Sequence, residues 1–179
     1  MHPWMTRRQM LCSLGNGFGA LGLASVLAGE LFQGRCHMNE CSWFSVEERD
    51  IVGSTADGAL FKTVMKTWVS EHPDGDYEKK RPRRGVGTSV SYFFCSKSRP
   101  AVVWESQPGI WEADFLTPGS PLGPSGAAEA ATVEYFVVCH GLSPEGGFAE
   151  MGKRFGYPPA ESAPEPRKLA RPEDLLARP

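Results

Sequence analysis

The cysteines carry the most definite chemistry in this sequence. Beyond the N-terminal segment four remain, an even number that can form two disulfide bonds: Cys36, Cys41, Cys95 and Cys139. Four cysteines allow three pairings, and the sequence does not choose among them, although Cys36 and Cys41 are close enough along the chain to pair within a loop. Disulfides are therefore the first interpretation, and unpaired structural cysteines in the interior are the second.

A metal centre is a third interpretation of the same thiols. Its ligands would be the cysteines and two neighbouring imidazoles, namely Cys36, His37, Cys41, Cys139 and His140. Structural zinc sites are typically built from two closely spaced pairs of ligands, and this chain has only one such pair, Cys36 with Cys41. The spacing therefore favours disulfides, and we expect no bound metal.

Two other patterns have the residue types of a reactive or ion-binding site. Cys139 precedes His140, as a thiol nucleophile beside its base. Successive residues of a strand point to opposite faces, however, so in a predicted strand these two side chains would not meet. Asp74 and Asp76 resemble the start of a calcium loop, but the required downstream ligands are absent. We therefore expect neither catalysis at Cys139 nor calcium binding.

Charge and aromatic residues suggest binding surfaces. The basic run at 79–84 could contact phosphates, but a solvated connector is the favoured interpretation. Trp104 and Trp111 could cover one apolar surface and stack on sugar rings, yet a core role is favoured because each ring buries a large area. The net charge of −2 argues against nucleic acid as the main partner.

The N-terminal segment predicts export. Arg7 and Arg8 precede a weakly apolar run from Met10 to Ala28, which is typical of a twin-arginine signal cleaved near Ala28. Glycines weaken this run as a helix, so we expect no stable membrane span. The G-x-G-x-x-G match at 17–22 lacks a preceding strand, so we expect no cofactor. The predicted partner is the twin-arginine export machinery, and the predicted location is periplasmic or extracellular.

The same segment is similar to a known family. Met1–Trp4, Thr6–Leu11 and Gly15–Ala24 closely resemble the start of a large family of twin-arginine-exported bacterial proteins. Those proteins carry a domain of unknown function that is similar to sulfatases and alkaline phosphatases. The resemblance covers residues 1–30, and the Gly-Gly-Pro-Ser segment and metal-binding acids of that family do not follow. The resemblance therefore implies export but no catalytic or metal-binding residue.

Hydrophobic patterns predict the elements that would position these residues. Apolar residues at helical spacing predict an amphipathic helix over 59–69. Runs rich in Val, Tyr and Phe predict strands over 88–95, 101–105 and 132–139. With 20 glycines and 15 prolines in 179 residues, a well-packed fold is less expected. The predicted fold class is α+β, a small irregular domain with a few short strands and one amphipathic helix.

Composition also divides the chain. The Pro- and Gly-rich stretch at 117–126 predicts a flexible linker, and the proline-rich, weakly apolar end predicts a disordered tail. The expected organisation is a signal segment (1–28), a small α+β region (29–116), the linker (117–126), a strand-containing segment (127–156) and a disordered C-terminal tail (157–179).

These patterns predict an exported binding or orphan domain without catalytic activity, whose ligand the sequence does not identify. The alternative is a truncated or frame-disrupted member of the exported sulfatase-like family, with no independent activity, because a well-formed leader is followed by a body without the family's motifs. The encoding DNA, read in its other two frames after codon 30, would reveal that body if the alternative holds.

Overall fold

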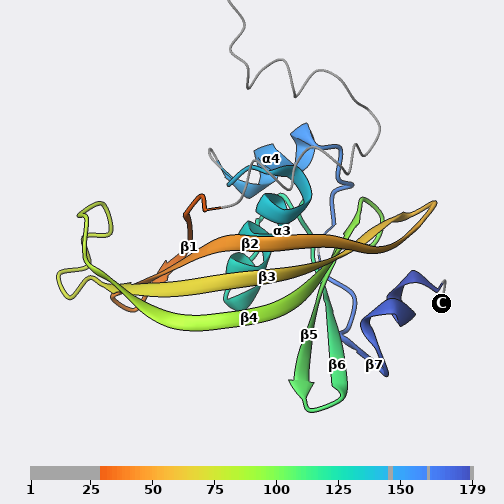
Figure 1. Cartoon of the computed structure of the whole chain (residues 1–179). Helices are drawn as coiled ribbons and strands as arrows, with labels where there is room; N and C mark the ends of the chain where they lie inside the picture. The colour runs from red at the N-terminus through yellow and green to blue at the C-terminus, as the bar shows by residue number, and fades with distance from the viewer. Residues whose placement is uncertain (1–28, 145–146, 161, 178–179) are drawn as a thin grey trace, which may run out of the picture.

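The described part of the chain forms one antiparallel β-sheet. The computed structural model describes residues 29–144, 147–160 and 162–177. Arg7, Arg8 and Ala28 of the predicted export signal lie outside these residues. Seven strands are ordered β1-β2-β3-β4-β5-β6-β7, so each pairs with its neighbours in the sequence (Figure 1). The strands are β1 (Phe32–His37), β2 (Glu40–Thr55), β3 (Gly58–Glu71), β4 (Arg83–Ser96), β5 (Ala101–Gln107), β6 (Ile110–Phe115) and β7 (Arg167–Leu169).

Three helical segments accompany the sheet in the described residues. The longest, α3 (Ala127–His140), crosses one face of the long strands β2, β3 and β4 (Figure 1). A short helix α4 (Phe148–Arg154) follows it, and a 3₁₀ helix η1 (Pro172–Leu176) comes after β7. None of the helices described is long and apolar enough to cross a membrane.

The expected α+β class is wrong, because the fold is mainly β. The helix predicted over 59–69 lies within β3. There Phe61, Thr63 and Met65 are buried while Lys62 and Lys66 are exposed, which is the period of two of a strand. Apolar residues on the outer face of the same strand, among them Trp68, created the additional helical spacing. The strands predicted over 88–95 and 101–105 are confirmed as parts of β4 and β5.

The strand predicted over 132–139 is also wrong, because these residues belong to α3. Four alanines in the first turns favour the helix. Its C-terminal half is buried on almost every side, so it shows no polar face that would reveal a helical period. The helix ends at Gly141, whose φ of 70° is the left-handed conformation that glycine adopts readily. The segment 127–156, expected to contain a strand, contains α3 and α4.

The C-terminal tail is ordered through residue 177, with 161 undescribed, so the predicted disorder of this region is wrong. Residues of β7 pair with β6, and Trp111 stands opposite Leu169. Leu169 and Leu175 are buried against the sheet. Burial of these two leucines stabilises the C-terminal segment, although the segment as a whole has few apolar residues. The predicted linker at 117–126 contains neither helix nor strand.

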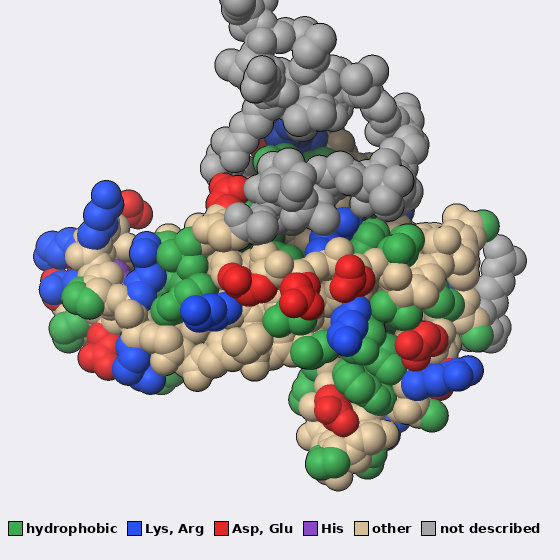
Figure 2. All heavy atoms as spheres, viewed as in Figure 1, with side chains coloured by type: hydrophobic (Ala, Val, Ile, Leu, Met, Phe, Trp, Pro, Cys, Tyr) green, Lys and Arg blue, Asp and Glu red, His purple; other side chains and the backbone are tan. Residues whose placement is uncertain are grey.

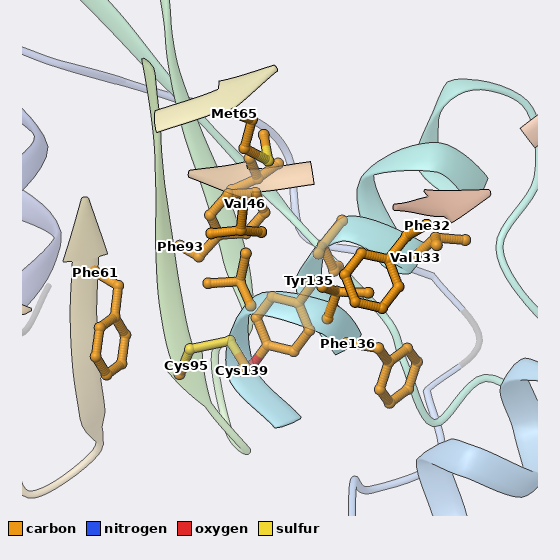
Figure 3. Packing of buried hydrophobic residues seen from close by; sticks show 14 of the residues in the cluster. Phe32, Val46, Phe61, Met65, Phe93, Cys95, Val133, Tyr135, Phe136 and Cys139 are labelled. Atoms are coloured by element: carbon orange, nitrogen blue, oxygen red, sulfur yellow. A yellow bond between two sulfur atoms is a disulfide. The ribbon is translucent and has the colours of Figure 1, made fainter. Parts of the chain in front are cut away.

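The sheet separates two hydrophobic cores. The inner core lies between α3 and the strands, where Phe136 and Val133 of the helix belong to the same cluster as Val46, Phe61 and Phe93 (Figure 3). The outer core lies on the opposite face and is smaller. It is formed by Leu60, Phe94, Ala101, Val103, Ala113, Leu169 and Leu175.

Candidate functional site: a cavity where the two cores meet

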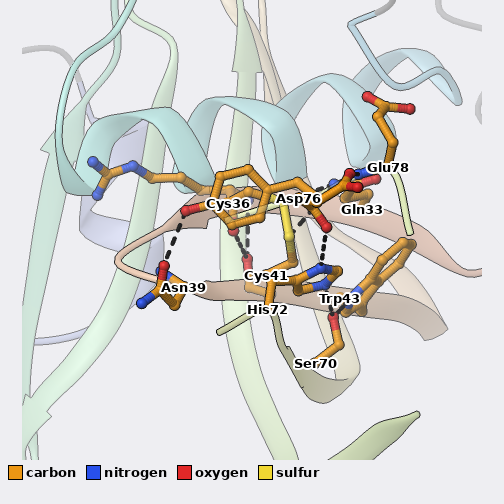
Figure 4. The surroundings of a disulfide bond; sticks show 12 residues. Gln33, Cys36, Asn39, Cys41, Trp43, Ser70, His72, Asp76 and Glu78 are labelled. Carbon is orange, nitrogen blue, oxygen red and sulfur yellow. Dashed lines mark hydrogen bonds between the residues drawn. A yellow bond between two sulfur atoms is a disulfide. The ribbon is translucent and has the colours of Figure 1, made fainter. Parts of the chain in front are cut away.

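All four cysteines of the described residues form disulfides. Cys36 bonds Cys41 across the turn between β1 and β2, with the two Cα atoms 4.0 Å apart (Figure 4). Met38 and Asn39 form that turn with positive φ angles of 49° and 66°, as a two-residue hairpin loop requires. Cys95 of β4 bonds Cys139 of α3, which joins the helix to the sheet (Figure 3). The structure thus selects one of the three pairings that the sequence allows.

The disulfides bear on the two other interpretations of these cysteines, as metal ligands and as a nucleophile. A bonded sulfur is neither a thiolate ligand nor a nucleophile. Among the described residues no group of three or more His, Cys, Asp and Glu is arranged to hold a metal ion. The imidazole of His140 instead contacts the hydroxyl of Tyr157 at 2.7 Å.

The charged loop between β3 and β4 neutralises itself in part. Lys79 lies 2.9 Å from Asp74 and 3.2 Å from Asp76, and Arg81 lies 2.8 Å from Asp74. The hydrogen bond from Lys79 is the main reason why the pKa of Asp74 lies well below its usual range. The guanidinium of Arg83 stacks on the ring of Trp43 at 3.9 Å. Figure 2 shows Lys and Arg side chains gathered at this end of the sheet, with acidic side chains among them.

The two tryptophans considered for sugar binding do not share a surface. Trp104 stands opposite Glu112, and Glu105 stands opposite Trp111. Residues that face each other across an antiparallel pair lie on the same side of the sheet, so Trp104 and Trp111 lie on opposite sides. Trp111 packs edge-on against Tyr92 beside the outer core, whereas Trp104 is 39% exposed. A pair of stacking platforms is therefore not present at these positions.

The feature best suited to binding is a cavity of about 400 Å³. Three segments that are distant in the sequence line it: Lys97–Pro100 between β4 and β5, Phe115–Pro118 at the end of β6, and residues from Tyr157 to Arg167 after α4. Its walls include Leu116 and Tyr157 of the inner core and Phe115, which packs on the outer core. The cavity thus lies where the two cores adjoin, and most of its lining is apolar.

Close backbone contacts fix one wall of the cavity. A Cβ atom on Gly119 would collide with the carbonyl oxygen of Pro158, and one on Gly152 would collide with the carbonyl oxygen of Pro118. Glycine lets these backbones approach each other where any side chain would separate them. The segment after β6 is therefore packed directly against α4 and against the chain that follows it.

A buried hydrogen-bond network holds the Tyr157 wall. The hydroxyl of Tyr157 donates to that of Tyr135 at 3.1 Å, and the hydroxyl of Tyr135 donates to the carbonyl oxygen of Ser96 at 3.0 Å. Since the Tyr157 proton is committed to Tyr135, Nε2 of His140 is the donor in its contact with Tyr157. The ring of His140 also stacks on Phe155, with centroids 3.9 Å apart.

Burial keeps this network uncharged. Burial, and next the positive charge of Lys97, lowers the pKa of His140 from 6.5 to about 4. Burial also raises the pKa of Tyr157 from 10.0 to about 12. The imidazole and the phenol are therefore both neutral near pH 7. Such a neutral, hydrogen-bonded network orders a wall of the cavity.

Sequence reasoning missed the cavity. It singled out His140 as a metal ligand or base, and it did not single out Tyr135, Tyr157 or Lys97. No local pattern marks these residues, because their relation depends on three loops converging at one end of the sheet. Comparisons of the chain with protein families, with curated proteins and with solved structures found no match.

Proposed function

We infer that this chain is an exported, non-catalytic domain that binds a small apolar molecule in the cavity between Lys97–Pro100, Phe115–Pro118, Tyr157–Ala160 and Ser162–Arg167. The observation that carries this proposal is the cavity itself. Its volume of about 400 Å³ falls within the range of about 300–1,000 Å³ typical of small-molecule sites, which are concave and mainly apolar. The hydrogen-bonded Tyr157 and the glycine contacts support a site that is formed before the ligand arrives.

The disulfides support the exported location. Disulfide bonds persist in oxidising compartments and are rare in the cytosol. Two such bonds in one chain agree with the twin-arginine pattern at Arg7 and Arg8. Fractionation of cells that express the full chain tests this part of the proposal. A protein retained in the cytoplasm with free thiols would contradict it.

The binding proposal is tested with an uncharged fluorescent probe, N-phenyl-1-naphthylamine. We expect the oxidised protein to bind it with one site and a rise in fluorescence. Thr117→Trp places a large ring within the lining and should abolish that binding. Thr88→Trp is the matched control, because Thr88 is an exposed residue of β4 that does not line the cavity.

Either of two outcomes would contradict the binding proposal. One is a wild-type protein that does not bind the probe. The other is equal binding by the wild-type protein and Thr117→Trp, with circular dichroism showing that both are folded. In the second case the probe would be binding elsewhere on the surface.

A further inference from the structure

Among the described residues, the charged side chains that line the cavity are all basic. Lys97, Arg99 and Arg167 line it, and the described lining residues include no aspartate or glutamate. Positive charges at a mainly apolar site attract an anionic group, and the surrounding low dielectric strengthens that attraction relative to water.

The three basic side chains differ in their hydrogen-bond and ion-pair partners. Arg99 lies 3.5 Å from Asp57, a long contact through one nitrogen. Arg167 donates to the carbonyl oxygen of Asp174 at 3.1 Å, which is a neutral acceptor that does not cancel its charge. Lys97 makes no hydrogen bond or ion pair to the described residues. At least two positive charges at the cavity are therefore without a partner of opposite sign in the part of the chain described here.

The apolar walls define the rest of the ligand. Phe115, Leu116 and Pro118 form one side of the cavity, and Tyr157, Pro158 and Pro164 belong to another. Burying hydrocarbon against these residues is favourable by about 25 cal/mol per Å². A molecule that matches both features has an anionic group, such as a carboxylate, and an apolar body.

We propose that the cavity binds an amphipathic carboxylate of the medium-chain fatty acid type, with its head group attracted by the positive charges of Lys97, Arg99 and Arg167 in the lining. This assignment rests on the proposed function and specifies the ligand class of the same cavity. Arginine binds a carboxylate through two parallel hydrogen bonds, and lysine contributes as a point charge at the exposed rim.

The head-group assignment is tested by displacement of bound N-phenyl-1-naphthylamine with three ligands of equal tail length: decanoate, decanol and decyltrimethylammonium. We expect decanoate to bind about tenfold more tightly than decanol, the size of one hydrogen bond to a charged group. The cationic ligand should bind most weakly. Decanoate affinity should fall with rising salt, whereas decanol affinity should not.

Lys97→Met is the most informative variant, because Lys97 is exposed and its loss breaks no hydrogen bond or ion pair between described residues. It should weaken decanoate several-fold and leave decanol unchanged. Arg84→Met, an exposed basic residue outside this cavity, is the control and should alter neither ligand. Arg167→Met should act like Lys97→Met if its fold is retained.

The outcomes separate the two proposals. Equal affinities of the wild-type protein for decanoate and decanol, or an unchanged decanoate affinity in Lys97→Met, would overturn the head-group assignment while leaving an apolar binding site. Failure of the wild-type protein to bind the probe or any of the three ligands would overturn the proposed function as well.

Discussion

The inner and outer cores of this protein are closed in different ways. A fourteen-residue helix covers the inner core, and the Cys95–Cys139 disulfide joins that helix to the sheet. The outer core is closed by β7, which has three residues, and by η1, which has five. No disulfide joins either of these short elements to the sheet. The cavity adjoins both cores. Its shape therefore depends on α3, which a disulfide joins to the sheet, and on the C-terminal segment, which no disulfide joins to it.

This difference shows how a small sheet is stabilised on two sides. A helix has enough apolar surface to form a core, and a crosslink further reduces the entropy of the unfolded chain. A short C-terminal segment depends on a few well-buried side chains, chiefly Leu169 and Leu175. We therefore expect the two faces to differ in global stability and in local opening.

The largest expected effect comes from removing the crosslink of the inner core. The Cys95–Cys139 bond spans 44 residues and the Cys36–Cys41 bond spans 5. Loop-closure entropy predicts stabilisation of about 4 kcal/mol for the first and about 2 kcal/mol for the second. The free energy of unfolding in urea should fall accordingly in Cys95→Ala/Cys139→Ala and in Cys36→Ala/Cys41→Ala. Equal losses of unfolding free energy in the two variants would show that the Cys95–Cys139 bond stabilises the fold no more than the Cys36–Cys41 bond does.

The next largest effect concerns the outer core. Leu175 is fully buried, and Leu175→Ala should cost about 3 kcal/mol through lost burial and the cavity left behind. Amide hydrogen exchange in β6 and β7 should accelerate more than exchange in α3, because the C-terminal segment opens first. Leu122→Ala is the control, since Leu122 is 88% exposed and its truncation should change neither quantity. Uniform acceleration across the chain would mean that the two faces unfold as one unit.

The smallest effect is a pH dependence on the inner face. Burial raises the pKa of Glu134 in α3 from 4.5 to about 7. A raised acid pKa means that the folded state binds the proton more tightly, so this contribution is complete below pH 4.5 and is lost as pH rises to about 7. Glu134→Gln should therefore be more stable than the wild-type protein at pH 8, by about 1–2 kcal/mol after allowance for partial solvent screening.

The control for this pH effect is a second glutamate variant. Urea unfolding at pH 4.5 should give equal stabilities for Glu134→Gln and the wild-type protein. Comparing the two proteins at each pH cancels the opposite contribution of His140, whose pKa of about 4 reduces stability as pH falls below 6.5. Glu150→Gln, at an exposed site in α4, should follow the wild-type profile. A constant offset between Glu134→Gln and the wild-type protein at all pH values would contradict the burial of Glu134.

Part of the fold was predictable from local patterns. Val90, Tyr92 and Phe94 in β4, and Val102 with Trp104 in β5, are β-branched or aromatic residues in short runs, and both strands are present. The prediction for β3 failed because apolar residues on both faces of that strand satisfied a helical period as well as a period of two. The prediction for α3 failed because a helix buried on almost every side has no polar face.

The sequence by itself determined two strands, the even set of cysteines and their capacity for two disulfides, because residue type and short-range spacing decide these features. Only the tertiary structure decided which cysteines pair, which face each core occupies and where the cavity lies. The physical reason is that Cys95 and Cys139, like Lys97, Leu116 and Tyr157, come together through strand pairing and helix packing. Contacts between residues so far apart in the chain leave no periodic trace in the sequence between them.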